Sequence, residues 1–273
     1  MVYSKEQTAL LDKQTFGYLE VEERENVLRI TLNRPEKKNA LNPVMLNELA
    51  YALCYAAQHR HIWAVLIRAK GNVFCSGADL SAMMGMAEDR PSTIPAPDGD
   101  ILLAELFHHL HKPSIAQVEG DVYAGGFLIL AGCTYVVACN DIKLELPETK
   151  RGLFPFQVMA SLLEVMPTRK VLDWCIRGYN LPVEEALELG LVTHVAIQET
   201  IDGEIGKILR DILSNSPSAI RLGLEAHDFL RQKTMDGMHR YLHSMLMRTL
   251  ETEDAAEGLT AFREKRKPEW KGQ

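Results

Sequence analysis

Residues 114–126 read SIAQVEGDVYAGG, an apolar stretch that runs into two adjacent glycines. The pattern of residues 114–120 is typical of a buried strand, and the apolar run FLILAGC at 127–133 is typical of a helix. Glycine and alanine at the start of a helix leave its first backbone N–H groups facing outward, with no side chain to cover them. A second stretch, FCSGADL at residues 74–80, repeats this order after the strand candidate of residues 64–74. The two stretches therefore predict two strand-to-helix turns with accessible amides.

The alternation of strands and helices extends along the chain in both directions. Residues 18–23 and 27–32 alternate in the manner of a hairpin, and Asn42-Pro43 opens a helix whose apolar residues recur at helical spacing. The buried strand that contains residues 64–74 can begin as early as residue 61, because HIWAVLIR at 61–68 is already largely apolar, and a third strand unit leads to a helix expected from about residue 156 to 164. Because this alternation occurs three times, we predict an α/β fold with crossover connections.

The last quarter of the chain has a different pattern. From about Ile201 it is charged and almost wholly helical, with no strand candidate. We therefore predict a core of residues 1–200 and a C-terminal helical region of residues 201–273. Residues 85–100, GMAEDRPSTIPAPDGD, are rich in proline and predict a mobile loop over the surface.

Composition indicates a globular enzyme. The chain has 273 residues, 47 % of them apolar, and a formal net charge of −7. An acidic excess gives no electrostatic support for binding nucleic acid or an anionic membrane, and the longest apolar stretch, 122–131, is too short to span a bilayer. The five cysteines have no C-x-x-C spacing, which favours reduced thiols over disulfides or zinc. With no secretory signal pattern in the first residues, we expect a cytoplasmic protein.

The two strand-to-helix turns predict a specific chemistry if they face each other. Two N–H groups would then donate to one oxygen, and the positive ends of two helix dipoles would add to their effect. A thioester enolate needs this arrangement to hold its negative charge. Either stretch alone is more typical of tight packing, but the two together favour an anion-stabilising site.

The order of motifs along the chain resembles the enoyl-CoA hydratase/isomerase (crotonase) family. The resemblance covers roughly residues 18–272 and rests on six segments in order: NRPEKKNALNPVM, FCSGADLSAM, VEGDVYAGG, LPETKRGLFP, ALELGLVTHV and EGLTAFREKRKPEWKG. It implies a spiral of ββα units followed by a helical trimerisation region, with a homotrimer or a hexamer (a dimer of trimers) as the assembly. It also implies an acyl-CoA thioester substrate whose enolate is held at two backbone N–H groups.

The resemblance assigns roles to individual residues. It implies that the oxyanion-hole N–H groups belong to Ala78 and Gly125, with Ser76 and Gly77 along the pantetheine path of coenzyme A. It further implies that Lys38, in the loop expected at the adenine end, and Lys265, in the basic C-terminal segment, contact coenzyme A. A solvated basic face is the alternative for Lys265. For Asp79, helix capping is favoured over catalysis.

Acid–base residues distinguish the reactions of this family. Its hydratases carry one glutamate three residues after the oxyanion glycine and a second after a proline in the next unit; the first position here is Leu128 and the second is Glu148. Hydration of an enoyl thioester divides its proton transfers between two carboxylates, whereas moving a double bond from C3–C4 to C2–C3 needs one base. A single carboxylate with a pKa raised by an apolar pocket suits that transfer. We therefore favour isomerase over hydratase slightly, with Glu148 as general acid/base.

Several alternatives remain open at this stage. Asp121 or Glu145 could replace the missing acid, and Tyr123 could donate a hydrogen bond near the site. The loss of one glutamate also allows a catalytically silent acyl-CoA-binding relative, and the family includes decarboxylases and thioester hydrolases.

Other sequence features indicate no additional group in the site. His108, His109 and His111 have no acidic ligand at metal spacing, so helix capping is favoured and no metal is expected. No P-loop or G-x-G-x-x-G motif is present, so we expect no cofactor beyond the coenzyme A of the substrate. The methionines at 83, 84 and 86 are candidates for an adaptable acyl-pocket wall or for ordinary packing.

Overall fold

The computed structural model describes residues 1–83, 90–231, 248 and 250–273. Its strands are, in chain order, β1 (Leu19–Arg24), β2 (Val27–Leu32), β3 (Ala64–Ala69), β4 (Val73–Cys75), β5 (Ser114–Val118), β6 (Asp121–Tyr123), β7 (Tyr135–Cys139), β8 (Leu144–Glu145), β9 (Asn180–Leu181) and β10 (His194–Ala196). They form a six-stranded sheet in the order β1-β2-β3-β5-β7-β10 and a four-stranded sheet in the order β4-β6-β8-β9.

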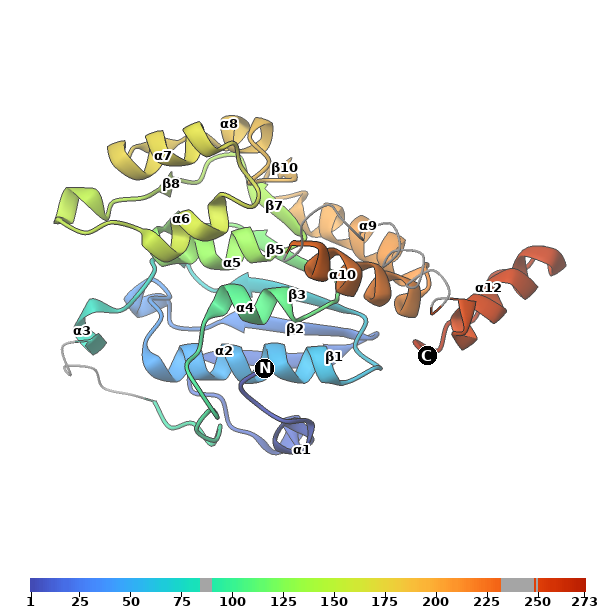
Figure 1. The fold of residues 1–273 in the computed structure, drawn as a ribbon. Helices are drawn as coiled ribbons and strands as arrows, with labels where there is room; N and C mark the ends of the chain where they lie inside the picture. The colour runs from blue at the N-terminus through green and yellow to red at the C-terminus, as the bar shows by residue number, and fades with distance from the viewer. Residues whose placement is uncertain (84–89, 232–247, 249) are drawn as a thin grey trace.

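Helices surround the two sheets (Figure 1). The α-helices are α1 (Lys5–Thr8), α2 (Pro43–Gln58), α3 (Leu80–Met83), α4 (Leu103–His108), α5 (Phe127–Gly132), α6 (Phe156–Leu162), α7 (Thr168–Arg177), α8 (Val183–Glu188), α9 (Ile201–Leu213), α10 (Pro217–Arg231) and α12 (Glu253–Glu264). Short 3-10 helices are η1 (Leu11–Lys13), η2 (Pro35–Lys37), η3 (Ala124–Gly126) and η4 (Thr149–Arg151).

The chain winds as a spiral through both sheets. Each turn places one strand in the large sheet and the next strand in the small sheet, and then forms a helix: β3, β4 and α3, then β5, β6 and α5, then β7, β8 and α6. Successive turns pair in parallel: β3 with β5 and β5 with β7 in the large sheet, and β4 with β6 and β6 with β8 in the small sheet. The predicted spiral of ββα units is therefore confirmed.

Glycines lie where the chain passes from one sheet to the other. The sequence predicts single strands over 64–74 and 114–120. In the structure the first is two short strands, β3 and β4, in different sheets, whereas the second is β5, and the chain crosses at Glu119 and Gly120 to β6 in the small sheet. Gly120 lies at the second crossing, where a Cβ atom would come within 2.7 Å of the carbonyl oxygen of Asn72. Only a residue without a side chain allows the two crossings to approach this closely.

The hairpin and the first long helix form as local rules predict. β1 pairs antiparallel with β2, with Arg24 opposite Val27, and the two turn residues Glu25 and Asn26 have φ values of 52° and 63°. Two left-handed residues match the twist of the strands in a tight hairpin turn. In α2, the Asn42 side chain accepts a hydrogen bond from the Met45 amide at 2.8 Å, and Pro43 occupies the first helical position.

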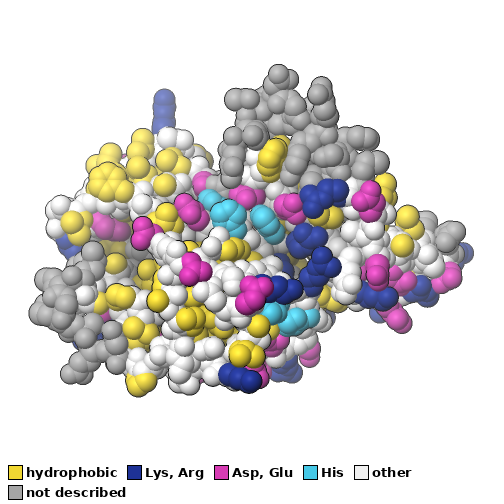
Figure 2. Space-filling model, turned by 60° about the horizontal axis from the view of Figure 1, so that its bottom comes forward, with side chains coloured by type: hydrophobic (Ala, Val, Ile, Leu, Met, Phe, Trp, Pro, Cys, Tyr) yellow, Lys and Arg dark blue, Asp and Glu magenta, His cyan; other side chains and the backbone are white. Residues whose placement is uncertain are grey.

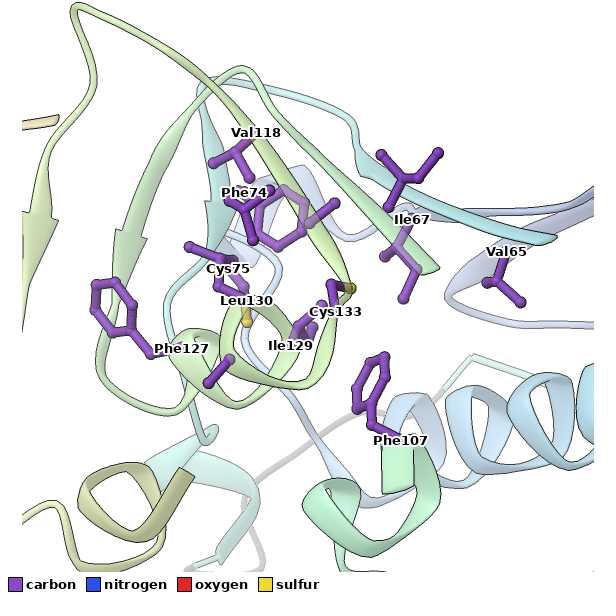
Figure 3. Close-up of a cluster of buried hydrophobic side chains, with 14 of the residues drawn as sticks. Val65, Ile67, Phe74, Cys75, Phe107, Val118, Phe127, Ile129, Leu130 and Cys133 are labelled. Carbon is purple, nitrogen blue, oxygen red and sulfur yellow. The ribbon is translucent and has the colours of Figure 1, made fainter. Parts of the chain in front are cut away.

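One large apolar cluster holds the sheets and helices together. Figure 3 shows side chains from β3, β4, β5, α4 and α5 meeting in part of this cluster, including Phe74, Phe107 and Phe127. The Phe127 ring also packs edge-on against the buried Trp174 of α7, with ring centroids 4.9 Å apart. Because α5 is buried on this side, η3, which leads into it, is held in place at the end of β6.

The C-terminal part of the described chain is helical. α9 buries Ile201, Ile205 and Leu209 in the main core, and α12 lies at the right edge of Figure 1. Asp254 accepts hydrogen bonds from the Ser218 amide at 3.2 Å and from the Lys271 amide at 2.8 Å, so the final residues fold back onto the start of α10. The boundary between a core of 1–200 and a helical region of 201–273 stays a prediction.

Candidate active site

Three segments that the sequence singles out follow three neighbouring strands. β4, β6 and β8 are adjacent and parallel in the small sheet. Ala78 lies three residues after the end of β4, Gly125 two residues after the end of β6, and Glu148 three residues after the end of β8. Because the carboxyl ends of parallel strands meet at one edge of a sheet, the spiral places the three segments side by side at that edge.

The two glycine-containing turns are in direct backbone contact. Gly77 has a φ of +84°, and a Cβ atom added to it would lie 2.6 Å from the Gly125 amide nitrogen. A Cβ atom added to Gly125 would lie 3.5 Å from the amide nitrogen of Ala78. The amides of Ala78 and Gly125 are therefore brought close together, and the absence of a side chain at Gly77 permits this approach.

Hydrogen bonds fix the orientation of the Ala78 peptide. The Leu41 amide donates to the Gly77 carbonyl oxygen at 2.8 Å, and the Asp79 amide donates to the Leu41 carbonyl oxygen at 3.0 Å. In this parallel bridge Leu41 bonds to the Gly77 carbonyl and to the Asp79 N–H, which flank Ala78. Because backbone groups alternate in direction along an extended chain, the Ala78 N–H points away from Leu41. Gly125 lies in the first turn of η3, where backbone amides have no partner within the helix. Ala124 adopts the left-handed region with a φ of 51°, a strained conformation for a residue with a side chain.

Asp79 caps α3 and does not face the other site residues as a free carboxylate. One of its oxygens accepts hydrogen bonds from the amides of Ser81 and Ala82 at 3.0 and 3.2 Å, and the other pairs with the Arg34 guanidinium at 2.6 Å. Burial opposes ionisation, but the hydrogen bonds from Arg34 and from these amides hold the pKa of Asp79 below its usual value. This geometry agrees with capping, the role favoured from the sequence. The contribution of Arg34 was not predicted, because its partner lies 45 positions away in the sequence.

Breaking the Arg34–Asp79 pair should destabilise the protein strongly. The two side chains are only 4 % and 9 % exposed, so Arg34→Leu leaves a buried carboxylate without its cation. We expect the free energy of unfolding, measured by urea titration, to fall by about 3–5 kcal/mol. Lys207→Met is the matched control, because its pair with Glu204 is exposed and its loss should leave the urea midpoint almost unchanged. Equal urea midpoints for the two variants would contradict a structural role for the buried pair.

Glu148 is a partly buried carboxyl group at the start of η4. Its Oε2 atom is buried and has no hydrogen-bond partner within the described part of the chain. Burial raises the pKa of Glu148, against the opposing effects of its own backbone N–H and of the Arg151 charge. Leu128, the residue at the other hydratase position, is an aliphatic side chain packed against the core. Glu148 therefore has the properties of a proton-transfer group, and no carboxylate stands at the other hydratase position, Leu128.

The alternative acids are engaged in other interactions. Asp121 accepts hydrogen bonds from the Tyr123 hydroxyl and from the Lys143 amide, each at 2.8 Å. Glu145 pairs with Lys150 at 2.7 Å. Burial and the neighbouring Asp121 raise the pKa of Tyr123 to about 12, so this phenol stays protonated at neutral pH. These contacts support local structural roles for all three residues.

The residues assigned to coenzyme A are not all close together in one chain. Ser76 and Gly77 lie between β4 and Ala78, and Lys38 follows η2 with a left-handed φ of 54°. Lys265 follows α12, which lies at the opposite end of the molecule from α3 (Figure 1). Within one chain Lys265 is therefore separated from the other candidates, and the structure does not test its role.

Two of the three histidines in the cluster, His108 and His111, pair with acidic side chains. His108 lies 3.1 Å from Glu164, and His111 lies 3.4 Å from Asp228. Over residues 1–83, 90–231, 248 and 250–273, no set of three or more His, Cys, Asp or Glu side chains is arranged to hold a metal ion. The same ranges contain no helix that is long and apolar enough to cross a membrane. The candidate methionines at 84 and 86, and the side chain of Met83, lie outside what the structure describes.

Comparison with known proteins identifies the family. The family model described as "Enoyl-CoA hydratase/isomerase" matches residues 22–273, so the chain belongs to this family. It is 31 % identical to carnitinyl-CoA dehydratase of Salmonella arizonae, over 90 % of this chain and 95 % of that protein. It is 28 % identical to the mitochondrial enoyl-CoA hydratase domain-containing protein 3 of Danio rerio, over 91 % of this chain and 86 % of that protein.

Solved structures agree with this assignment. An enoyl-CoA hydratase from Mycobacterium tuberculosis H37Rv superposes with a TM-score of 0.82 at 30 % identity, over 94 % of this chain and 100 % of that one. An enoyl-CoA hydratase from Bacillus anthracis gives a TM-score of 0.83 at 26 % identity, over the same shares of the two chains. The crotonase fold predicted from the sequence motifs is therefore confirmed, and the chain is an enzyme-family member that acts on CoA thioesters.

Proposed function

We propose that the protein is an enoyl-CoA isomerase that moves a double bond from C3–C4 to C2–C3 of an acyl-CoA thioester. The observation that carries this proposal is a single, partly buried carboxyl group, Glu148, with Leu128 at the other acid position. The Glu148 carboxylate removes a proton from C2, the electrons of that C–H bond form a dienolate, and the same group returns the proton at C4. No water is added, so one acid–base residue is sufficient.

The backbone amides of Ala78 and Gly125 form the proposed oxyanion hole. Their approach at the Gly77 contact supports two N–H donors for the thioester oxygen as it gains negative charge. Ser76 and Gly77 lie along the pantetheine in this proposal, and Lys38 contacts the adenine end. The proposed reaction requires no cofactor beyond the coenzyme A that the substrate carries.

We further propose a homotrimer or a dimer of trimers. The position of α12 supports this assembly, because Lys265 lies at the far end of its own chain and is available to the coenzyme A bound by a neighbouring chain. A cytoplasmic location stays a prediction.

A second candidate reaction is hydration or dehydration of an acyl-CoA. It is favoured by the 31 % identity to a carnitinyl-CoA dehydratase, whose name describes that class of reaction. The aliphatic Leu128 is the observation against it, because a single carboxylate must then handle both the water and the α proton.

Substrates separate these reactions directly. The purified protein is given 3-enoyl-CoA and 2-enoyl-CoA thioesters, and the products are separated by chromatography. We expect 2-enoyl-CoA from the first substrate and little 3-hydroxyacyl-CoA from the second. Rapid formation of 3-hydroxyacyl-CoA would favour the hydratase. Binding without turnover of enoyl, malonyl and aryl thioesters would instead indicate a silent relative.

The pH dependence of isomerisation reports on Glu148. Only the carboxylate can accept the C2 proton, so kcat/KM should fall as the pH drops through the pKa of this group in the free enzyme. Because burial raises that pKa, the acid limb should have its midpoint above the ordinary glutamate value of about 4.3. The measurement is a pH–rate profile with 3-enoyl-CoA, and a midpoint at or below about 4 would contradict the prediction.

A further inference from the structure

The proposed chemistry needs a fixed distance between the oxyanion donors and the base. The thioester oxygen is held at the amides of Ala78 and Gly125, while the Glu148 carboxylate must reach C2 of the same substrate. A displacement of about 1 Å between such groups can cost about 10²-fold in rate. The strands that lead to the second and third of these residues share a short pairing, in which Val122 and Tyr123 of β6 have partners in β8. An element that contacts both segments would therefore fix their separation.

The C-terminal end of α7 lies directly against the segment that carries Glu148. Gly178 follows α7 with a φ of +57°, and its amide donates to the Trp174 carbonyl oxygen at 2.8 Å. A Cβ atom added to Gly178 would lie 2.6 Å from the carbonyl oxygen of Leu146 and 3.3 Å from the Oγ1 atom of Thr149. The end of α7 thus packs on residues on both sides of Glu148, and only glycine fits there without displacing them.

Two further interactions keep this end of α7 beside Glu148. β9 follows α7 and pairs antiparallel with β8, with Asn180 opposite Glu145. The Leu144 amide donates to the Asn180 side-chain oxygen at 3.0 Å. Burial and, to a smaller extent, the nearby charge of Glu148 raise the pKa of the Cys175 thiol of α7 to about 11. The Glu148 carboxyl group therefore lies close to the buried face of α7.

The same helix contacts the oxyanion side of the site. The Trp174 ring packs edge-on against Phe127, with centroids 4.9 Å apart, and both side chains are fully buried. The Phe127 amide donates to the Gly125 carbonyl oxygen, and the Trp174 indole N–H donates to the Tyr179 carbonyl oxygen at 2.9 Å. One helical turn, about 6 Å, separates Trp174 from Gly178. A single rigid turn of α7, which lies above β8 and α5 in Figure 1, therefore contacts both halves of the site.

Surface ion pairs are weaker supports than this buried contact. Lys150 pairs with Glu145 at 2.7 Å beside the Glu148 segment, but the Lys150 side chain is 53 % exposed. Figure 2 shows acidic side chains (magenta) next to basic (dark blue) and histidine (cyan) side chains on the surface of the face that it displays. Exposed pairs contribute little to stability, because water screens them and long side chains must be ordered. The position of Glu148 therefore depends mainly on packing against α7.

We infer that α7 is a brace that sets the distance between the oxyanion donors and Glu148, with Trp174 and Gly178 as its positioning residues. Neither residue touches the reacting atoms. Trp174 acts through Phe127, and Gly178 acts through Leu146. The inference rests on the roles proposed for the site residues, but it holds for any reaction that begins with the loss of a C2 proton.

Exchange of the C2 protons of butanoyl-CoA in deuterium oxide tests the brace on a substrate without a double bond. The Glu148 carboxylate removes a C2 proton, and the electrons of that C–H bond form the enolate. The carboxyl group then exchanges its proton with solvent and returns a deuteron to C2. Mass spectrometry measures the rate. For Gly178→Ala we expect exchange to fall about 10²-fold, with the affinity for the unreactive thioether S-butyl-CoA within about threefold of the wild type by calorimetry.

Gly190→Ala is the matched control for this variant. Gly190 also has a positive φ, +89°, and a Cβ atom there would lie 2.9 Å from the Val165 carbonyl oxygen. The clash is of the same kind, but it falls on a segment that carries none of the site residues. We expect C2 exchange within about threefold of the wild type. Equal losses of exchange in Gly178→Ala and Gly190→Ala would overturn the inference.

Trp174→Phe tests the other end of the brace and keeps the inference testable if Gly178→Ala does not fold. It retains an aromatic ring but shortens the contact with Phe127, so C2 exchange should fall about tenfold with the affinity for S-butyl-CoA unchanged. Trp63→Phe is its control, because Trp63 lies beside Gly272 in the C-terminal residues and should keep wild-type exchange. Wild-type exchange in Trp174→Phe, or the same loss in both tryptophan variants, would contradict the brace.

The outcomes separate the brace from the proposed isomerase. Loss of C2 exchange in Gly178→Ala and Trp174→Phe, in a protein that does not isomerise 3-enoyl-CoA, would uphold the brace and refute the isomerase. Isomerisation by the wild type, with full exchange in both variants, would overturn the brace and leave the isomerase in place. A wild type that exchanges no C2 proton would overturn the brace together with the role of Glu148.

Discussion

Glu148→Gln should reduce isomerisation of 3-enoyl-CoA by about 10³-fold, within the range of 10²–10⁴ that general acid–base catalysis contributes. Glutamine keeps the shape of the side chain but cannot accept the C2 proton. Binding of an acyl-CoA should stay within a few-fold of the wild type, because no substrate contact is removed other than the proton-transfer group. Steady-state kinetics measure the first effect, and calorimetry with an unreactive thioether measures the second.

Glu145→Gln is the matched control for this experiment. Glu145 carries the same carboxyl group three positions earlier, but it is paired with Lys150 at 2.7 Å. We expect its turnover to stay within threefold of the wild type. If Glu145→Gln lost activity and Glu148→Gln kept it, the assignment of the base would be wrong.

The stability of the Glu148→Gln variant has a predictable sign. Burial raises the pKa of Glu148 in the folded protein, so the neutral form is favoured there and ionisation at higher pH works against folding. The free energy of unfolding of the wild type is therefore higher when Glu148 is protonated in both states. This advantage is lost as the pH rises from the unfolded-state pKa through the folded-state pKa. Above that window Glu148→Gln should be at least as stable as the wild type, so a loss of activity at neutral pH would not reflect unfolding.

Much of the fold could be predicted because the deciding signals are local. The hairpin rests on two turn residues with positive φ, and α2 begins at an asparagine cap followed by proline. The division of the predicted strand 64–74 between the two sheets, and the crossing after β5, were not predicted. A continuous apolar run looks the same whether it stays in one sheet or crosses to another, and only the backbone contact at Gly120 distinguishes the two.

Part of the candidate site could also be predicted, because its signals are local. The segments that carry Ala78, Gly125 and Glu148 have local motifs, and the order of the spiral brings them together at one sheet edge. The Arg34–Asp79 pair and the hydrogen bond from the Tyr3 hydroxyl to Asn47 depend on contacts between distant parts of the chain. The sequence predicts a mobile loop over residues 85–100, whereas residues 90–100, the part of it that the structure describes, are hydrogen-bonded to residues 2–18. Such contacts become visible only once the tertiary structure is known.

The second large effect is expected for Gly77→Ala. The new Cβ atom would lie 2.6 Å from the Gly125 amide nitrogen and 2.8 Å from the Ala124 Cβ atom, distances that real side chains do not reach. The turns after β4 and β6 must then move apart, and the two proposed oxyanion donors separate. We expect kcat for 3-enoyl-CoA to fall about 10²–10³-fold, the cost of losing one donor from an oxyanion hole.

A matched glycine separates this clash from backbone strain. Gly152 also has a positive φ, +74° against +84° for Gly77, but a Cβ atom there meets nothing within 4 Å. Gly152→Ala therefore introduces similar strain, of about 1–2 kcal/mol in stability, without moving the neighbouring turn. Kinetics with 3-enoyl-CoA and thermal unfolding are measured for both variants. The contact between Gly77 and Gly125 brings the Ala78 and Gly125 amides together, and only Gly77→Ala disturbs it. If both variants lost the same kcat, the closeness of these two amides would not be the source of catalysis.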